Sequence, residues 1–160
     1  MAFHHDLLKH ASKALIPGPE GLTQADLRRA VSTAYYAVFH LLIAETTVNW
    51  SRDSSRDALS RMFDHRVMAK SSDRLLDPKA FPFTAEDPVV VHTLRQVAAA
   101  FVDLQRQRHI ADYDNATNWA PAEAKREVET AGKAFAALES IRDEKIAQEY
   151  LVSLLIKPRG

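Results

Sequence analysis

The chain contains no cysteine, and only four of its 160 residues are glycine. Without cysteine it forms neither disulfide bonds nor thiolate metal sites, which fits a reducing compartment. The scarcity of glycine, a hydrophobic content of 46% and runs rich in Ala, Leu, Arg, Glu and Gln favour helix over sheet. The length suits one domain with a single core and is short for two, so residues 1–160 are predicted to form one helical domain.

A net charge and a long apolar run are also missing. The 21 basic residues balance the 21 acidic residues, so a nucleic acid would have to be bound by a local patch. No stretch of about 18 uncharged apolar residues exists to span a membrane, and residues 1–15 do not resemble a secretion signal. The histidines at 4, 5 and 10 lack a partner cluster at zinc-site spacing. We therefore expect a cytoplasmic protein with no membrane contact, no metal and no cofactor.

The most apolar stretch is residues 27–46, LRRAVSTAYYAVFHLLIAET. Apolar side chains recur at helical spacing on two of its sides, which leaves little face for water and predicts a buried central helix. Thr23 is a good N-cap, and Asp26 follows three residues later as in a capping box. Residues 24–49 would form a rod of roughly 39 Å around which the other helices pack.

The remaining helices are predicted from apolar periodicity and from breaker residues. They are expected at 3–15, about 54–71, about 90–108 and from Pro121 to about 141. Residues 77–88 should form an ordered loop with its two phenylalanine rings against the bundle, and 111–119 a loop or helix end. The polar residues 142–145 are expected either to bend the last of these helices or to start a separate one. The C-terminal tail, about 146–156, is apolar. Its part from Tyr150 to Ile156 exceeds what a terminal turn usually covers, which makes it the best candidate for a dimer interface.

Residues 106–114 break the ordinary pattern. Arg108 and Asp112 are four residues apart and can pair on a helix, while His109 and Tyr113 share the adjacent row. In a structural interpretation, Asp112 pairs with a basic residue such as Arg29 and locks two helices together. In a functional interpretation, Arg108, His109 and Asp112 line a cleft for a phosphate or an RNA backbone, with arginine as a forked cation and histidine as a proton shuttle.

Three segments resemble a known family. RRAVSTAYYAVFH at 28–40, FDHRVM at 63–68 and LQRQRHIADYD at 104–114 are similar to HEPN domains, in particular to the bacterial branch with an AYYAxFH helix and an Arg-x-x-Ala-Asp-Tyr element. The resemblance implies an all-α, antiparallel bundle of four to five helices and frequent homodimerisation. It also implies a nucleotidyltransferase-type partner protein in toxin-antitoxin or defence systems.

Many HEPN relatives are metal-independent endoribonucleases that use an arginine followed by a histidine with four to six residues between them. Arg108-His109 matches the opening of that motif, but Tyr-Asp-Asn at 113–115 stands where the second histidine should fall. We therefore expect a regulatory protein that binds RNA, a nucleotide or a partner protein without turnover. One alternative is an RNA-cleaving toxin that uses Arg108 with His109 or His65. A second is a structural adaptor that docks another helix.

The other candidate residues have competing interpretations. His65 matches a position of the family motif. A structural role and a place in the same cleft as Arg108 explain it equally well. His40 lies at the polar edge of an apolar helix and is expected to be a hydrogen-bonded core histidine rather than a catalytic one. Tyr35 and Tyr36 favour core packing over base stacking. The predicted structural or ligand-cleft residues are Arg29, Tyr36, His40, Asp112 and Tyr113.

Overall fold

A computed structural model describes residues 2–81, 83 and 86–157. Over these residues the chain forms seven α-helices and no β-strand, which confirms the all-α prediction. The helices are α1 (Phe3–Lys13), α2 (Gln24–Thr47), α3 (Asp53–Ser60), α4 (His65–Leu76), α5 (Pro88–Tyr113), α6 (Pro121–Ile141) and α7 (Lys145–Ser153). No helix in the described part is long and apolar enough to cross a membrane.

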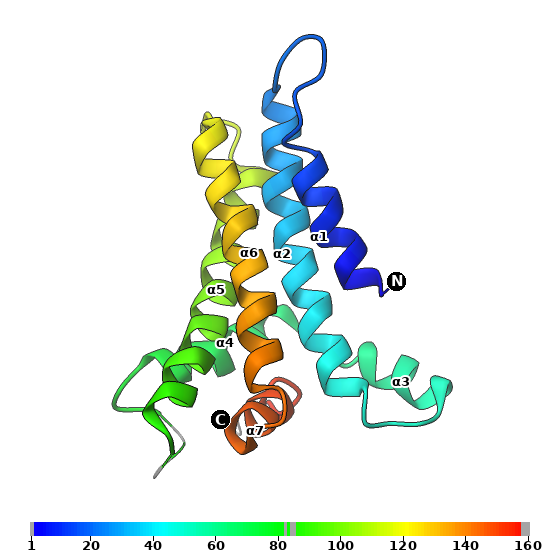
Figure 1. The fold of residues 1–160 in the computed structure, drawn as a ribbon, viewed down its shortest axis with the longest axis vertical. Coiled ribbons are helices and arrows are strands. Elements are labelled where there is room, and N and C mark those ends of the chain that lie inside the picture. Colours follow the sequence, from blue (N-terminus) through cyan, green and yellow to red (C-terminus); the bar gives the residue numbers. More distant parts are fainter. Residues whose placement is uncertain (1, 82, 84–85, 158–160) are drawn as a thin grey trace.

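Helix α2 is the centre of the bundle. It packs against α1, α5 and α6, and these four helices alternate in direction (Figure 1). Helices α4 and α7 lie toward the end of the bundle where α2 and α6 end, and α3 projects to one side, level with the last turns of α2 (Figure 1). The bundle is therefore antiparallel, with three short helices added to four longer ones.

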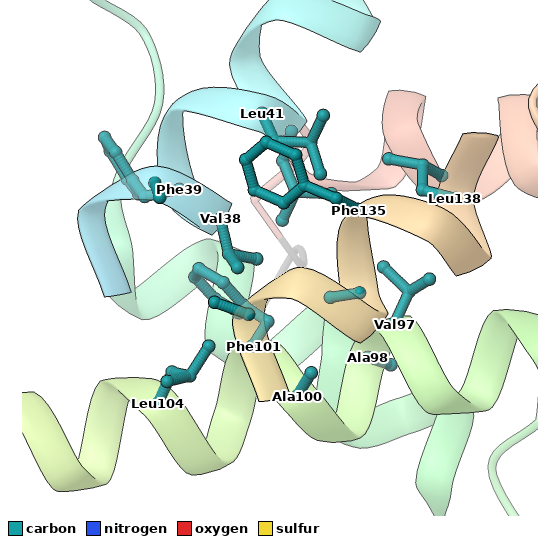
Figure 2. Close-up of a cluster of buried hydrophobic side chains, with 14 of the residues drawn as sticks. Val38, Phe39, Leu41, Val97, Ala98, Ala100, Phe101, Leu104, Phe135 and Leu138 are labelled. Carbon is teal, nitrogen blue, oxygen red and sulfur yellow. The ribbon is translucent and has the colours of Figure 1, made fainter. Parts of the chain in front are cut away.

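The start and the burial of α2 follow the prediction. The Asp26 carboxylate accepts a hydrogen bond from the Thr23 backbone N–H at 3.0 Å, and the Thr23 hydroxyl accepts one from the Asp26 N–H at 3.2 Å. Farther along, Val38 and Leu41 meet the α5 side chain Phe101 and the α6 side chain Phe135 (Figure 2). The predicted buried central helix is confirmed, and it ends at Thr47 rather than at 49.

The single helix predicted at 54–71 is wrong. The chain forms α3 and α4 instead, because the Asp64 carboxylate accepts hydrogen bonds from the N–H groups of Arg66 and Val67, at 2.8 and 3.1 Å. These bonds cap a new helix at His65. This break and the separate α7 raise the number of helices above the expected four to five.

Helix α5 ends at Tyr113, inside the segment 111–119 that was predicted to be a loop or a helix end. It runs to Tyr113 because Ala111, only 3% exposed, is buried with Leu27 and Trp119 in a second apolar cluster. Helix α6 begins at Pro121 as predicted, and the Glu123 carboxylate accepts a hydrogen bond from the Ala120 N–H at 2.9 Å. The two long helices are thus joined by only a short loop.

The C-terminal helix α7 packs into the same core. Tyr150, Leu151 and Leu154 are buried, and the Tyr150 hydroxyl hydrogen-bonds with that of Ser72 at 2.7 Å. The dimer interface expected from Tyr150 to Ile156 stays a prediction, and only part of its apolar surface is free, because Val152 and Ile156 are 52% and 59% exposed. The loop before α5 places its two phenylalanines against the core as predicted, while its residues 82, 84 and 85 lie outside the described ranges.

Candidate functional site

Arg108 lies between α5 and two tyrosines of α2. Its guanidinium carbon is 5.0 Å from the centre of the Tyr35 ring and 5.8 Å from that of Tyr36. These are cation–π distances, and the Arg108 side chain is only 14% exposed. Its buried Nε has no hydrogen-bond partner in the part of the chain that the structure describes. The site therefore holds a largely buried cation whose hydrogen-bond donors are not all used.

His65 reaches the same tyrosine from α4. Its ring stacks on Phe39 with the ring centres 4.3 Å apart, and its Nδ1 contacts the Tyr35 hydroxyl. The side-chain amide of Gln105 donates a hydrogen bond to the His65 carbonyl at 3.3 Å, which ties the start of α4 to α5. Tyr35 thus has Arg108 over its ring and His65 at its hydroxyl, so the structure places the two sequence candidates together.

Burial sets the protonation of this site. It lowers the pKa of His65, and the positive charge of Arg108 acts in the same direction while Asp64 opposes it. Burial also lowers the pKa of His40, and the neighbouring His65 lowers it further. Burial raises the pKa of Tyr35. At neutral pH the imidazole of His65 is therefore favoured in its neutral form, and the Tyr35 hydroxyl keeps its proton and can donate it to Nδ1.

The carboxylate of Asp112 belongs to the Arg108 site. Asp112 Oδ2 is 3.8 Å from Arg108 Nη1, and it accepts a hydrogen bond from the Ser32 hydroxyl at 3.3 Å. The predicted lock with Arg29 is not found: among the ion pairs of the described residues, Asp112 joins Arg108, and Arg29 is exposed. An ion pair at 3.8 Å with a partly exposed carboxylate neutralises Arg108 only weakly.

The residue that locks α2 to α5 is Arg28. Its guanidinium donates to the carbonyl oxygens of Ala111 and Asp114, both at 2.8 Å, and of Thr117 at 2.6 Å. The last carbonyls of a helix lack partners within the helix, so a cation from a neighbouring helix satisfies them and favours the negative end of the dipole. Sequence reasoning chose Arg29 and missed Arg28. Adjacent residues of a helix point in different directions, and here Arg28 faces α5 while Arg29 is exposed.

The other histidine candidates are spread around the site. His109 is exposed, and its ring centre is 5.0 Å from that of Tyr113, which is 66% exposed. His40 packs edge-on between Phe39 and Phe3, with ring centres 5.2 and 4.8 Å away. Neither imidazole shares the Tyr35 contact that joins His65 to Arg108. The roles of His40, His109 and Tyr113 remain predictions.

Arg108 also borders an open hollow between α4 and α5. The hollow has a volume of about 380 Å³ and is lined by Ala69, Asp73, Val102, Gln105, Arg106, Arg108, His109 and Ile110. Two guanidinium groups, an amide and an imidazole thus face one space, with a single carboxylate among them. Over the described ranges, no group of three or more His, Asp or Glu side chains is arranged to hold a metal ion.

Tyr35 is the residue that sequence reasoning undervalued. It was predicted to be a packing residue, and it is fully buried, yet its hydroxyl connects to a histidine 30 residues away. Two adjacent tyrosines in an apolar helix were the available signal, since a buried tyrosine hydroxyl usually has a partner. Compared with protein-family models, with curated proteins and with solved structures, the chain shows no match.

Proposed function

We propose that the chain is a HEPN-type regulatory protein that binds a phosphate group of RNA or of a nucleotide at Arg108. The observation that carries this proposal is the guanidinium held against two tyrosine rings, with a buried Nε that has no partner among the described residues. The planar fork of arginine matches phosphate oxygens in a bidentate manner. A nucleotidyltransferase-type protein partner is part of the proposal and rests on the sequence resemblance alone.

The hollow beside Arg108 supports the same proposal. Arg106, Gln105 and His109 add donors along its wall, and Asp73 is its one carboxylate. Because the chain has no net charge, attraction of a polyanion has to come from such a local group of cations. A phosphate in the hollow would also partner the guanidinium that Asp112 leaves only weakly neutralised.

Removing the Arg108 guanidinium should weaken this binding strongly. For a labelled single-stranded RNA of mixed sequence, Arg108→Ala is expected to weaken binding at least about 30-fold, because a forked, charge-assisted contact is lost. Arg108→Lys keeps the charge without the fork, so its RNA affinity should lie between those of the wild type and Arg108→Ala. Fluorescence anisotropy at fixed salt measures the affinity, and ATP and inorganic phosphate as competitors separate RNA from smaller phosphate ligands.

The matched control is Arg126→Ala, which removes the same charge from an exposed position of α6. It should bind as the wild type does, and thermal melting should show that all variants are folded. Equal affinities for the Arg108 and Arg126 variants would show that the RNA contact lies elsewhere.

A second candidate function is RNA cleavage with His65 as the base. The observation that favours it is the shared contact of His65 and Arg108 with Tyr35. In the tautomer whose Nδ1–H donates to the Tyr35 oxygen, the neutral Nε2 of His65 can take the proton of a ribose 2′-hydroxyl while that oxygen attacks phosphorus. The 5′-oxygen leaves and takes a proton from water, and Arg108 would stabilise the charge on the phosphorane oxygens. Such a reaction yields a 2′,3′-cyclic phosphate and needs no metal.

Cleavage is tested by incubating total RNA with excess protein in EDTA. If His65 is the base, His65→Ala should reduce the rate by at least about 100-fold while leaving RNA binding unchanged, and His109→Ala should keep most of the activity. RNA that stays intact with excess wild-type protein would count against catalysis and leave the binding proposal in place.

A further inference from the structure

A buried carboxyl pair joins α5 to α6, apart from the Arg108 site. Glu127 of α6 is only 4% exposed, and its carboxyl group is hydrogen-bonded to that of Asp103 on α5. The Oε2 atom of Glu127 has no partner in the described part of the chain. Ionised carboxylates only accept hydrogen bonds, so a hydrogen bond between the two acids requires that one of them holds a proton. The two helices are therefore joined by a shared proton.

The charges near the pair do not balance two carboxylates. Neither acid takes part in an ion pair among the residues described here. Over the same residues, Arg126 of α6 is the one cation whose charge acts on Glu127, and its side chain is exposed to water. A buried carboxylate without a close cation is costly, so the doubly ionised form of the pair is disfavoured.

The other helices packed against α6 are α1 and α2, and titratable groups of both meet it at its far end. Glu45 of α2 pairs with Arg142, just after α6, at 2.8 Å. The charges of both act on His4 of α1, whose ring centre is 4.5 Å from that of His5. Within the described ranges, no charge of α1 or α2 acts on Glu127. The protonation of the carboxyl pair is therefore decided by α5 and α6.

The pair changes its charge near neutral pH. Burial raises the pKa of Glu127 to about 7, and the hydrogen bond and the negative charge of Asp103 act in the same direction, while Arg126 opposes them. Asp103 also lines an open groove of about 660 Å³ between α5 and α6, through which water can exchange protons with the pair. Below this pH a proton joins the two helices, and above it two negative charges face each other across a seam largely closed to water.

We propose that Asp103 and Glu127 form a pH-sensitive contact, which holds α5 and α6 together while it shares a proton and separates them once both acids are ionised. The unfolded chain loses the Glu127 proton near pH 4.5, whereas the folded chain keeps it up to about pH 7. Folding therefore takes up a proton between these values, so the stability of the folded chain falls as the pH rises through this window. Acidification tightens the seam between α5 and α6, and alkaline conditions loosen it.

Glu127→Gln tests this contact, because the new amide can donate to Asp103 at every pH. Relative to the variant, the wild type should show an equilibrium constant for unfolding that rises about 50-fold between about pH 5 and about pH 8. The two chains should be about equally stable at the lower pH, and the variant should be the more stable one at the higher pH. Urea unfolding followed by circular dichroism measures both constants.

The protonation itself is measured by carbon-13 NMR of the glutamate carboxyl groups. The wild type should show a Glu resonance with a midpoint near pH 7, which Glu127→Gln removes. Asp103→Asn replaces the neighbouring charge with an amide donor and should lower that midpoint by at least about one pH unit. An unchanged midpoint in this variant would show that burial alone holds the proton, and a wild-type midpoint below about 5.5 would show that no proton is shared. Either result would overturn the proposal.

The matched control is Glu139→Gln, which removes the same charge from an exposed position of α6. Its stability should depend on pH as that of the wild type does, and thermal melting should show that every variant folds. Parallel pH dependence in the wild type and in Glu127→Gln would also contradict the proposal. The NMR titration of the wild type needs no variant, so it decides the question even where a variant unfolds.

Discussion

Replacing Phe101 with alanine is expected to lower the free energy of unfolding by about 4 kcal/mol. The ring is fully buried where α2, α5 and α6 meet (Figure 2), and its centre is 5.7 Å from that of Tyr35. The loss combines the apolar transfer free energy of the ring with the cavity that the surrounding helices cannot fill. Urea unfolding followed by circular dichroism measures it.

The matched control for Phe101→Ala is Phe3→Ala. The Phe3 side chain is 59% exposed, so its removal should cost less than about 1 kcal/mol. Because Phe101 supports the ring of Tyr35, the Phe101 variant should also bind RNA more weakly under conditions where it remains folded. A loss below about 1 kcal/mol for Phe101→Ala would contradict the central position of this ring.

Replacing Arg28 with alanine is expected to lower the free energy of unfolding by about 3 kcal/mol. The guanidinium donates to three carbonyl oxygens at the end of α5 and in the following loop, and its removal leaves them without these partners. Arg29→Ala, one residue away, removes the same charge from an exposed position and should change stability by about 0.5 kcal/mol or less. Urea unfolding of both variants measures the contrast.

The comparison of the Arg28 and Arg29 variants decides which arginine joins α2 to α5. If Arg29→Ala lowered the free energy of unfolding more than Arg28→Ala, the pairing of Asp112 with Arg29 would be supported and the Arg28 contacts would contribute little. Proton exchange of the backbone N–H groups at 114–120 gives a second measure, because this loop should lose protection in the Arg28 variant alone.

Patterns local in the sequence predicted the fold well. The capping box at Thr23 and Asp26, the apolar rows of α2 and the proline at the start of α6 each depend on residues within a few positions of one another. The break between α3 and α4 depends on a single carboxylate at 64, and helical periodicity continues across it. Periodicity alone therefore merged two helices into one.

The candidate site was only partly predictable, because its contacts join distant residues. Arg108 and Asp112 are one turn apart, so their pairing was visible in the sequence. The link from Tyr35 to His65 depends on how α4 packs on α2, and the choice between Arg28 and Arg29 depends on a rotation of about 100° around the helix axis. Neither follows from composition or spacing.

The position of His65 at the first residue of α4 ties the chemistry of the site to the fraying of one helix end. Its imidazole stays beside Tyr35 only while the first turn of α4 is wound, and that turn is held by the Asp64 cap and by Gln105. A cap of this kind contributes about 1 kcal/mol, so local unfolding there requires far less free energy than global unfolding. Events confined to the segment between α3 and α4 can therefore remove the histidine from the site while the bundle stays folded.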